Sequence, residues 1–253
     1  MTGIIEWIGS EPFISAALAA LALFFLTNWW REGRIKAQLS AAGHNARLPV
    51  YNALMVQLWG LTALTLALWL VSGRSLAEIG LLGMEDGWRS WTGWGLALAG
   101  CTYMLWLLVQ AARSRKARIE LRRQIGDSGD LDMIRPETSA EYRRFNWVAI
   151  TAGVTEEILF RGFLIAVFAL WMPVWVAAIA ALAVFIAGHS YQGPSGMLRI
   201  LPISVILTLV YLLSGSLWPG IVLHAVVDLA GGGLFRITAH YENRDAEAGT
   251  AQA

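Results

Sequence analysis

Long runs of apolar residues, broken only by short blocks of charge, constrain this chain more than any other feature. Of its 253 residues, 57% are hydrophobic and 15% are charged, whereas soluble domains contain about 25% charged residues. A bilayer core needs about 20 apolar residues per helix, and only helices or closed barrels cross lipid with every backbone group paired. These runs are too long and continuous for barrel strands. The sequence therefore predicts an all-α, polytopic transmembrane helix bundle.

Seven apolar segments are counted as spans, of which the last three are short and closely spaced. They cover residues 12–30, 50–72, 90–112, 145–169, 174–190, 199–214 and 217–235. Between the second and third spans, segment 75–86 is predicted to be a short amphipathic stretch at the membrane interface. The pattern divides the chain into an N-terminal three-span membrane region (1–112), a basic cytoplasmic loop (113–144), a helix core (145–235) and a disordered cytoplasmic tail (236–253).

The distribution of basic residues predicts the orientation. Sixteen Lys and Arg side chains fall in the loops at one end of the spans, nine of them in 113–144, and only Arg74 and Arg89 fall in the alternate loops. Because cytoplasmic loops carry the excess of Lys and Arg, we expect a multi-pass protein of the cell membrane with its N-terminus outside. No basic residue precedes the first apolar run, so no cleavable signal peptide is expected. The net charge of +1 predicts no nucleic-acid partner; membrane lipids are the expected surroundings.

Six ionisable side chains interrupt the apolar spans of the core. They are Glu156, Glu157, Arg161, His189, His224 and Asp228. A charge at mid-bilayer costs roughly 2.5–3.5 kcal/mol on insertion scales, so such residues persist where they pair, face a cavity or carry out chemistry. They lie on three different spans. One shared site in the interior of the bundle explains them better than three separate exceptions.

On the fourth span, the spacing of the charged residues indicates one ion pair and one unpaired acid. Glu157 and Arg161 are four residues apart and share a helix face, so we expect them to pair, in a structural more than a catalytic role. Glu156 lies about 100° around the helix from its neighbour. It has no partner on its own helix and is the strongest candidate for a chemical role.

The two histidines have alternative interpretations. His224 and Asp228 are four residues apart, so Asp228 either orients the imidazole for chemistry or forms a hydrogen bond that pins two turns of one helix. His189 lies at the end of its span and also fits an interfacial residue. Phe185, one turn before His189, is expected to be a packing residue.

Three motifs on successive helices resemble the CPBP family, which comprises the CAAX proteases and the bacteriocin-processing enzymes, also called Abi proteins. They read Glu156-Glu157-x-x-x-Arg161, Phe185-x-x-x-His189 and His224-x-x-x-Asp228. The matching region runs from about 145 to 235. One position departs from the pattern, because Asp228 stands where characterised CAAX proteases usually have Asn.

The resemblance implies an intramembrane endopeptidase with a cavity open to the cytoplasm. Its substrate would be a membrane-associated or lipophilic peptide, or a membrane protein. By position, Glu156 would be the general base that activates water, aided by His189. His224 and Asp228 would hold the oxyanion.

The same resemblance assigns supporting positions to Glu157, Arg161 and Phe185. The family has been described as metalloproteases, and His189, His224 and either Glu156 or Asp228 would then be the zinc ligands. The chain has no HExxH motif, and a carboxylate base with an oxyanion donor is complete without metal, so we expect no cofactor, with zinc catalysis as the alternative.

Two further classes of function compete with the protease. A non-catalytic immunity or scaffold protein of the same fold would tolerate a degenerate motif, whereas the motif here is intact. An ion- or proton-coupled transporter would use the same buried acids, but the two halves of the chain carry no matching broken helices. The sequence does not indicate which peptide is cut.

Overall fold

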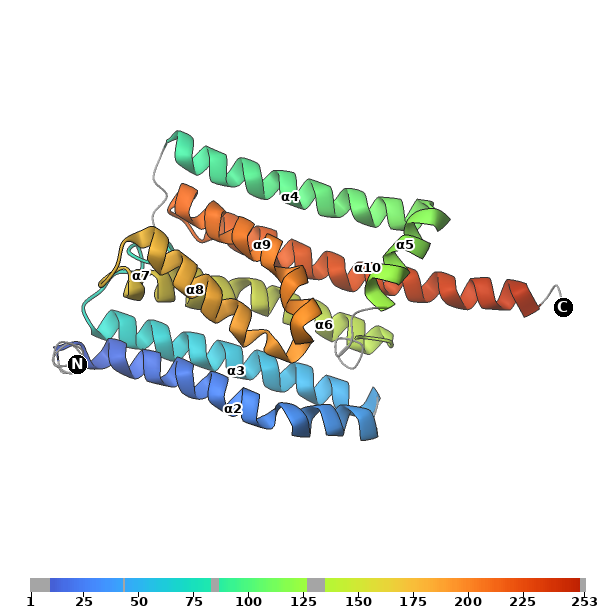
Figure 1. Cartoon of the computed structure of the whole chain (residues 1–253), viewed down its shortest axis with the longest axis horizontal. Helices are drawn as coiled ribbons and strands as arrows, with labels where there is room; N and C mark the ends of the chain where they lie inside the picture. The colour runs from blue at the N-terminus through green and yellow to red at the C-terminus, as the bar shows by residue number, and fades with distance from the viewer. Residues whose placement is uncertain (1–9, 43, 83–86, 127–134, 251–253) are drawn as a thin grey trace.

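The computed structural model describes residues 10–42, 44–82, 87–126 and 135–250, and in these residues it contains helices and no strands. In chain order the elements are α2 (Pro12–Ala42), α3 (His44–Val71), α4 (Trp88–Arg113), α5 (Arg115–Gly126), α6 (Ser139–Glu156), the π-helix η2 (Glu157–Leu164), α7 (Ile165–Phe168), α8 (Val174–Gly188), the 3₁₀ turn η3 (Ser190–Gln192), α9 (Gly193–Ser214) and α10 (Trp218–Thr250). The long helices lie side by side along one axis (Figure 1). The predicted all-α helix bundle is confirmed.

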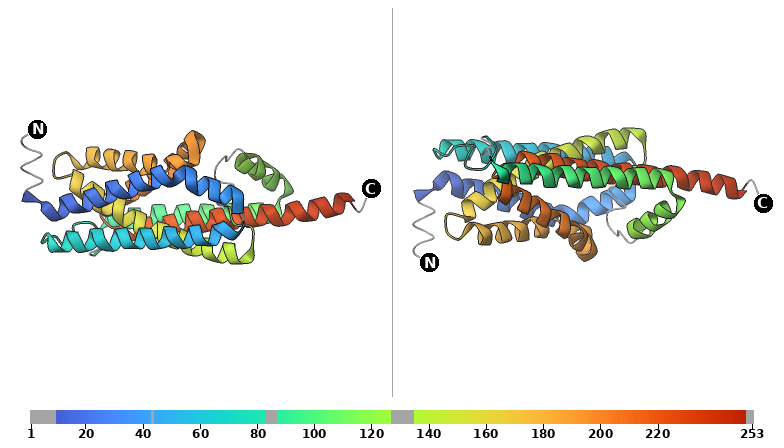
Figure 2. Two further views of the ribbon diagram at one scale, coloured as in Figure 1. Left: turned by 90° about the horizontal axis from the view of Figure 1, so that it is seen from below. Right: turned by 90° about the horizontal axis from the view of Figure 1, so that it is seen from above.

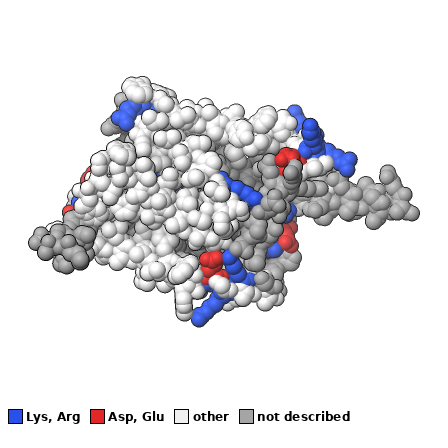
Figure 3. All heavy atoms as spheres, in the orientation of Figure 1, with Lys and Arg blue, Asp and Glu red and all other residues white. Residues whose placement is uncertain are grey.

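Five helical stretches in the described residues are long and apolar enough to cross a membrane. They are Pro12–Leu39, Ala46–Val71, Trp88–Arg113, Ser190–Ser214 and Trp218–Tyr241. On the face shown in Figure 3, charges gather toward the ends of the long axis and leave a broad uncharged band between them. Large apolar side chains stand exposed along these helices, for example Val56 at 73% and Leu98 at 68%. An exposed apolar surface of this kind is stable in contact with lipid, and the chain is therefore a membrane protein.

Two of the seven predicted spans take a less regular form. The predicted span 145–169 is divided into α6, η2 and α7. The predicted span 174–190 corresponds to α8, whose 15 residues rise only about 22 Å, less than the roughly 30 Å of a hydrocarbon core. The count of seven spans and their orientation stay predictions.

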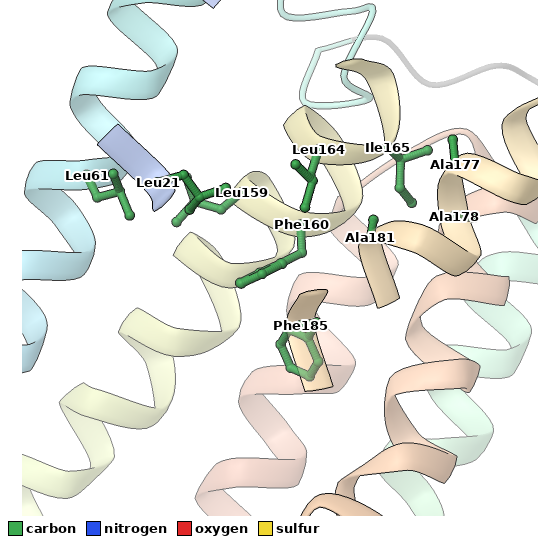
Figure 4. Packing of buried hydrophobic residues seen from close by; sticks show 10 residues of the cluster. All are labelled: Leu21, Leu61, Leu159, Phe160, Leu164, Ile165, Ala177, Ala178, Ala181 and Phe185. Carbon is green, nitrogen blue, oxygen red and sulfur yellow. The ribbon is translucent and has the colours of Figure 1, made fainter. Parts of the chain in front are cut away.

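One buried apolar cluster joins the N-terminal helices to the predicted core. Phe160 of η2 and Phe185 of α8 meet edge to face with ring centroids 5.0 Å apart. Leu21 of α2 and Leu61 of α3 belong to the same cluster (Figure 4). The alanines of α8, such as Ala181, keep that helix close to η2. The two regions separated in the sequence therefore share one core.

Helix α10 runs through the middle of the bundle and contacts α6, α4 and α9. Its closest approach is to α6, where a Cβ on Gly153 would lie 2.8 Å from the backbone nitrogen of Ala225. No side chain fits at that distance, so glycine is required. This contact brings the acids at the end of α6 beside the polar residues of α10.

The segment predicted as the loop 113–144 contains a helix. Helix α5 turns away from α4 after Ser114 and lies across the end of the bundle (Figure 1). Both views in Figure 2 show it angled away from the long helices, although it contacts α4 and α10. Residues 127–134 of the predicted loop lie outside the described residues.

The structure also differs from the disordered tail predicted for 236–253. Helix α10 continues to Thr250 and projects beyond the other helices (Figure 2), and residues 251–253 lie outside the described residues. Tyr241 anchors this extension, since its hydroxyl donates to the carbonyl of Ala112 at 3.3 Å. The guanidinium of Arg118 lies 3.7 Å from the centre of the same ring. Such contacts between distant segments leave no trace in a hydropathy pattern.

The segment predicted as an interfacial stretch, 75–86, forms turns in its described part and packs against the start of α10. Ile79 is fully buried. Leu217 donates its backbone N–H to the carbonyl of Gly80 at 2.8 Å, and the indole of Trp218 donates to that of Leu81 at 3.1 Å. Gly80 has a φ of +72°, and a Cβ there would lie 2.7 Å from the carbonyl oxygen of Gly215, so this turn needs glycine.

Candidate active site

The two adjacent glutamates lie at the junction of two kinds of helix. Helix α6 begins with a capping box formed by Thr138 and Glu141 and ends at Glu156. The π-helix η2 starts at Glu157, and all eight of its residues are buried. Short π-helical segments are rare and occur frequently at functional sites. The side chain of Glu157 is fully buried, whereas that of Glu156 is 15% exposed.

Glu157 joins two cationic or basic side chains from different helices. Its Oε1 accepts a hydrogen bond from Arg161 Nη1 at 3.0 Å and lies 2.8 Å from His224 Nδ1. The ion pair expected between Glu157 and Arg161 is therefore present. The guanidinium of Arg161 also donates to the carbonyl of Ser204 at 3.4 Å and lies 4.3 Å from the ring centre of Phe185.

The carboxylate that orients His224 is Glu157, which corrects the expectation that Asp228 orients it. An ionised carboxylate only accepts hydrogen bonds, so Nδ1 of His224 carries the hydrogen and donates it to Glu157. The other ring nitrogen, Nε2, is left to face the site. Asp228 lies one turn further along α10, on the Nε2 side of the ring rather than at Nδ1.

Nε2 of His224 faces two carboxylates at nearly equal distances. Glu156 Oε2 lies 3.8 Å away and Asp228 Oδ2 lies 3.7 Å away. Both distances exceed that of a direct hydrogen bond and match a space bridged by a water or by a substrate atom. The side chain of Asp228 is 36% exposed, so the space opens on the Asp228 side.

His189 is held at the end of α8 by its own helix. Its Nδ1 donates to the carbonyl of Phe185 at 2.9 Å, which leaves Nε2 as the basic nitrogen of the neutral ring. The rings of Phe185 and His189 are 4.5 Å apart, and those of Phe185 and His224 are 6.5 Å apart. His189 is also close enough to act electrostatically on Asp228. The structure thus brings all seven residues singled out in the sequence to one region of the bundle.

Comparison with known proteins places these residues in a family. Residues 141–230 match the family profile described as Rce1-like, type II CAAX prenyl endopeptidase. Over this segment the chain is similar to the type II CAAX prenyl endopeptidases. The resemblance inferred from the three motifs is thereby confirmed, and all seven residues fall within the matched segment. Searches of the curated proteins and of the solved structures found no match to the chain.

In the described residues, the side chains of this matched segment are not arranged as a metal-ligand set. No group of three or more His, Cys, Asp and Glu side chains in the described residues is arranged to hold a metal ion. His224 already commits Nδ1 to Glu157, which leaves only its Nε2 as a possible metal ligand. We therefore derive no step through a metal.

Two features of the candidate site have no signal in the sequence pattern. The first is the Glu157–His224 hydrogen bond, because the two residues are 67 positions apart. The second is Tyr191 of η3, whose ring lies 5.8 Å from that of His189 and whose hydroxyl accepts from Gln192 at 3.1 Å. Tyr191 is close enough to feel the charges of Glu156 and Asp228, so it borders the open side of the site.

Proposed function

We propose that this protein is an intramembrane endopeptidase that hydrolyses a peptide bond with water activated by Glu156. The main observation that supports this proposal is the arrangement of side chains around His224. One ring nitrogen is fixed by the buried Glu157, and the other faces Glu156 and Asp228 across a gap of 3.7–3.8 Å. In this proposal the scissile carbonyl and the attacking water bind next to this nitrogen. The match of segment 141–230 to a protease family supports hydrolysis as the reaction class.

In this proposal Glu156 is the general base. Its carboxylate takes a proton from water while the water oxygen attacks the scissile carbonyl carbon. When the tetrahedral intermediate collapses, the C–N bond breaks and the protonated Glu156 returns the proton to the leaving amine. His189, with Nε2 as its free nitrogen, is placed to orient the water. General acid–base groups of this kind contribute about 10²–10⁴-fold to a rate.

His224 is proposed as the oxyanion donor. To donate from Nε2 it must carry a proton on both ring nitrogens, and the Glu157 carboxylate at Nδ1 then balances the ring charge. Arg161 holds Glu157 in place by donating to the same oxygen at 3.0 Å. Donors held in place before the reaction stabilise a developing oxyanion without reorganisation. Asp228, the most exposed of the group, borders the path by which the peptide enters.

The substrate class follows from where the site lies. Glu156 ends α6, a helix whose exposed side chains include Trp147 and Ile150. A peptide that reaches it has to be membrane-associated or lipophilic. We place the opening of the site at the cytoplasmic face because of the excess of basic residues in the 113–144 segment.

Substrate trapping tests this proposal. Glu156→Gln keeps the shape of the side chain but cannot accept the proton, so the variant should retain bound peptide that wild type cleaves. We expect peptides enriched on the purified Glu156→Gln protein to be cut when given to wild type. The matched control is Glu32→Gln, which removes a carboxylate paired with Lys36 on α2, away from the site, and should show no enrichment. Equal enrichment on both variants, or trapped peptides that wild type leaves intact, overturns the proposal.

A further inference from the structure

A hollow between α3 and α6 lies at the end of the bundle from which α10 projects. It has a volume of about 290 Å³ and is lined by Leu48 of α3 and by Ala140, Arg143, Arg144 and Trp147 of α6. Arg143 and Arg144 are adjacent, with Ala140 and Trp147 three to four positions on either side, so the four residues form one face of that helix. The N-terminal end of α6 lies at the same end of the bundle as the start of α3 and the end of α4 (Figure 1).

The two arginines of the hollow are available to bind an anion. In the described residues neither Arg143 nor Arg144 makes a hydrogen bond or ion pair, and both are exposed. The two acids that come shortly before them in the sequence are engaged by another arginine, because Arg47 lies 2.8 Å from Glu137 and 3.7 Å from Glu141. The guanidinium fork matches a phosphate group in geometry, which makes arginine the usual residue for phosphate recognition.

The other lining residues indicate that the anion is attached to a lipid. Trp147 is 61% exposed, and tryptophan is enriched at the level of the lipid head groups. One turn deeper on the same helix, Ile150 is 37% exposed and continues the apolar surface along which an acyl chain lies. A free phosphate would gain nothing from Trp147, Leu48 and Ile150, whereas a phospholipid contacts all three.

We propose that the hollow formed by Leu48, Ala140, Arg143, Arg144 and Trp147 binds the head group of an anionic phospholipid. Basic pockets between transmembrane helices are the usual form of such sites. The site is independent of the proposed peptidase activity. Lipid binding at the hollow nevertheless has one structural consequence for the proposed active site, because Glu156 lies twelve residues, about 18 Å, along α6 from Arg144. A lipid bound at the hollow therefore fixes the depth of Glu156 in the bilayer.

The test measures the thermal midpoint of the full chain, delipidated in neutral detergent, during titration with lipid. Phosphatidylglycerol should raise the midpoint, while phosphatidylcholine and inorganic phosphate should not. Arg143→Gln combined with Arg144→Gln should weaken the apparent affinity for phosphatidylglycerol by roughly tenfold or more, since each basic residue near a lipid surface contributes on the order of 1 kcal/mol. The Lys pair, Arg143→Lys with Arg144→Lys, keeps the charges and should retain most of the response.

A matched control removes two exposed charges at the same end of the bundle, outside the hollow. Arg115→Gln with Lys116→Gln on α5 should leave the phosphatidylglycerol response unchanged. Three results overturn the proposal: equal responses to phosphatidylglycerol and phosphatidylcholine, a full response to inorganic phosphate alone, or equal losses in the α5 and hollow variants. The last result would mean that charge at the membrane surface acts without a site.

Discussion

Glu157 is the residue on which the geometry of the site depends. One oxygen, Oε1, serves Arg161 and His224 together. The other, Oε2, has no hydrogen-bond partner in the described residues and lies against Gly220, where a Cβ would be 3.1 Å away. A buried carboxylate in this position is tolerated because the guanidinium and the imidazole balance its charge. The same residue therefore supports both folding and the direction of the His224 ring.

Replacing Glu157 with Gln is expected to lower stability and activity together. Arg161 would stay buried without its charge partner, and breaking a buried pair of this kind costs about 3–5 kcal/mol. The thermal midpoint in detergent measures the loss. Glu32→Gln, which breaks a partly exposed pair with Lys36, should cost at most about 1 kcal/mol. A Glu157→Gln protein with the wild-type midpoint would contradict the role in folding.

Asp228→Asn is expected to be tolerated. Asp228 makes no direct hydrogen bond to His224, since their closest atoms are 3.7 Å apart. Asn keeps the size and an acceptor oxygen at that position and adds a donor for an oxyanion. Turnover of a trapped peptide should fall by much less than the roughly 10²-fold that marks loss of an acid–base group. A loss as large as that would make the Asp228 carboxylate itself a proton-transfer group.

At the scale of the helices, close packing of α6 against α10 is what assembles the site. The contact at Gly153 and Ala225 brings the end of α6, with both glutamates, alongside His224. The buried π-helix η2 then directs Glu157 toward α10 and α9, while Glu156 keeps access to the open side. The chemistry thus depends on how closely two helices approach.

Gly153→Ala is expected to push α6 away from α10. The added Cβ would meet the backbone nitrogen of Ala225 at 2.8 Å, and backbone cannot move aside as a side chain does. We expect a lower thermal midpoint and a loss of peptidase activity. The control is Gly60→Ala on α3, where a Cβ meets nothing within 4 Å. There alanine should be neutral or stabilise by up to about 1 kcal/mol through helix propensity. Equal effects of both substitutions would contradict this account of the packing.

The sequence predicts the elements that depend on local residue patterns and misses those that depend on tertiary contacts. Long apolar runs predict α2, α3, α4 and α10, and the spacing of four residues predicts the Glu157–Arg161 pair. The π-helix η2 and the helix beyond residue 236 depend on contacts with distant segments. The partner of His224 was assigned to Asp228 because only the neighbour on its own helix is visible in a sequence. The true partner, Glu157, comes from another helix.

At the scale of the whole molecule, the separation of charge from apolar surface sets the position of the chain in a membrane. The uncharged band of Figure 3 runs between charged ends, and α10 projects past the bundle at one of them (Figure 2). The ends of α2 and α4, the start of α6 and the projecting end of α10 lie at the same end of the bundle (Figure 1). Most of the Lys and Arg residues lie at this end of the bundle, and we therefore expect this end to face the cytoplasm.

Reporter fusions test this orientation. Fusions after residues 40, 130 and 245 should report the cytoplasm, and a fusion after residue 86 should report the outside. The reason is the division of basic residues, sixteen against two, between the two sets of loops. An external signal at residue 130 would reverse the orientation and move the opening of the site to the other face.

The most direct test of the whole account is the turnover of a trapped peptide by purified wild type and by Glu156→Gln, each with and without a zinc chelator. The account predicts that Glu156→Gln keeps the wild-type thermal midpoint and loses roughly 10²–10⁴-fold in rate. Wild type should keep its rate with the chelator present. Near-normal turnover by Glu156→Gln would contradict glutamate-activated hydrolysis, and loss of wild-type activity on chelation with recovery on added zinc would replace it with a metal-dependent mechanism.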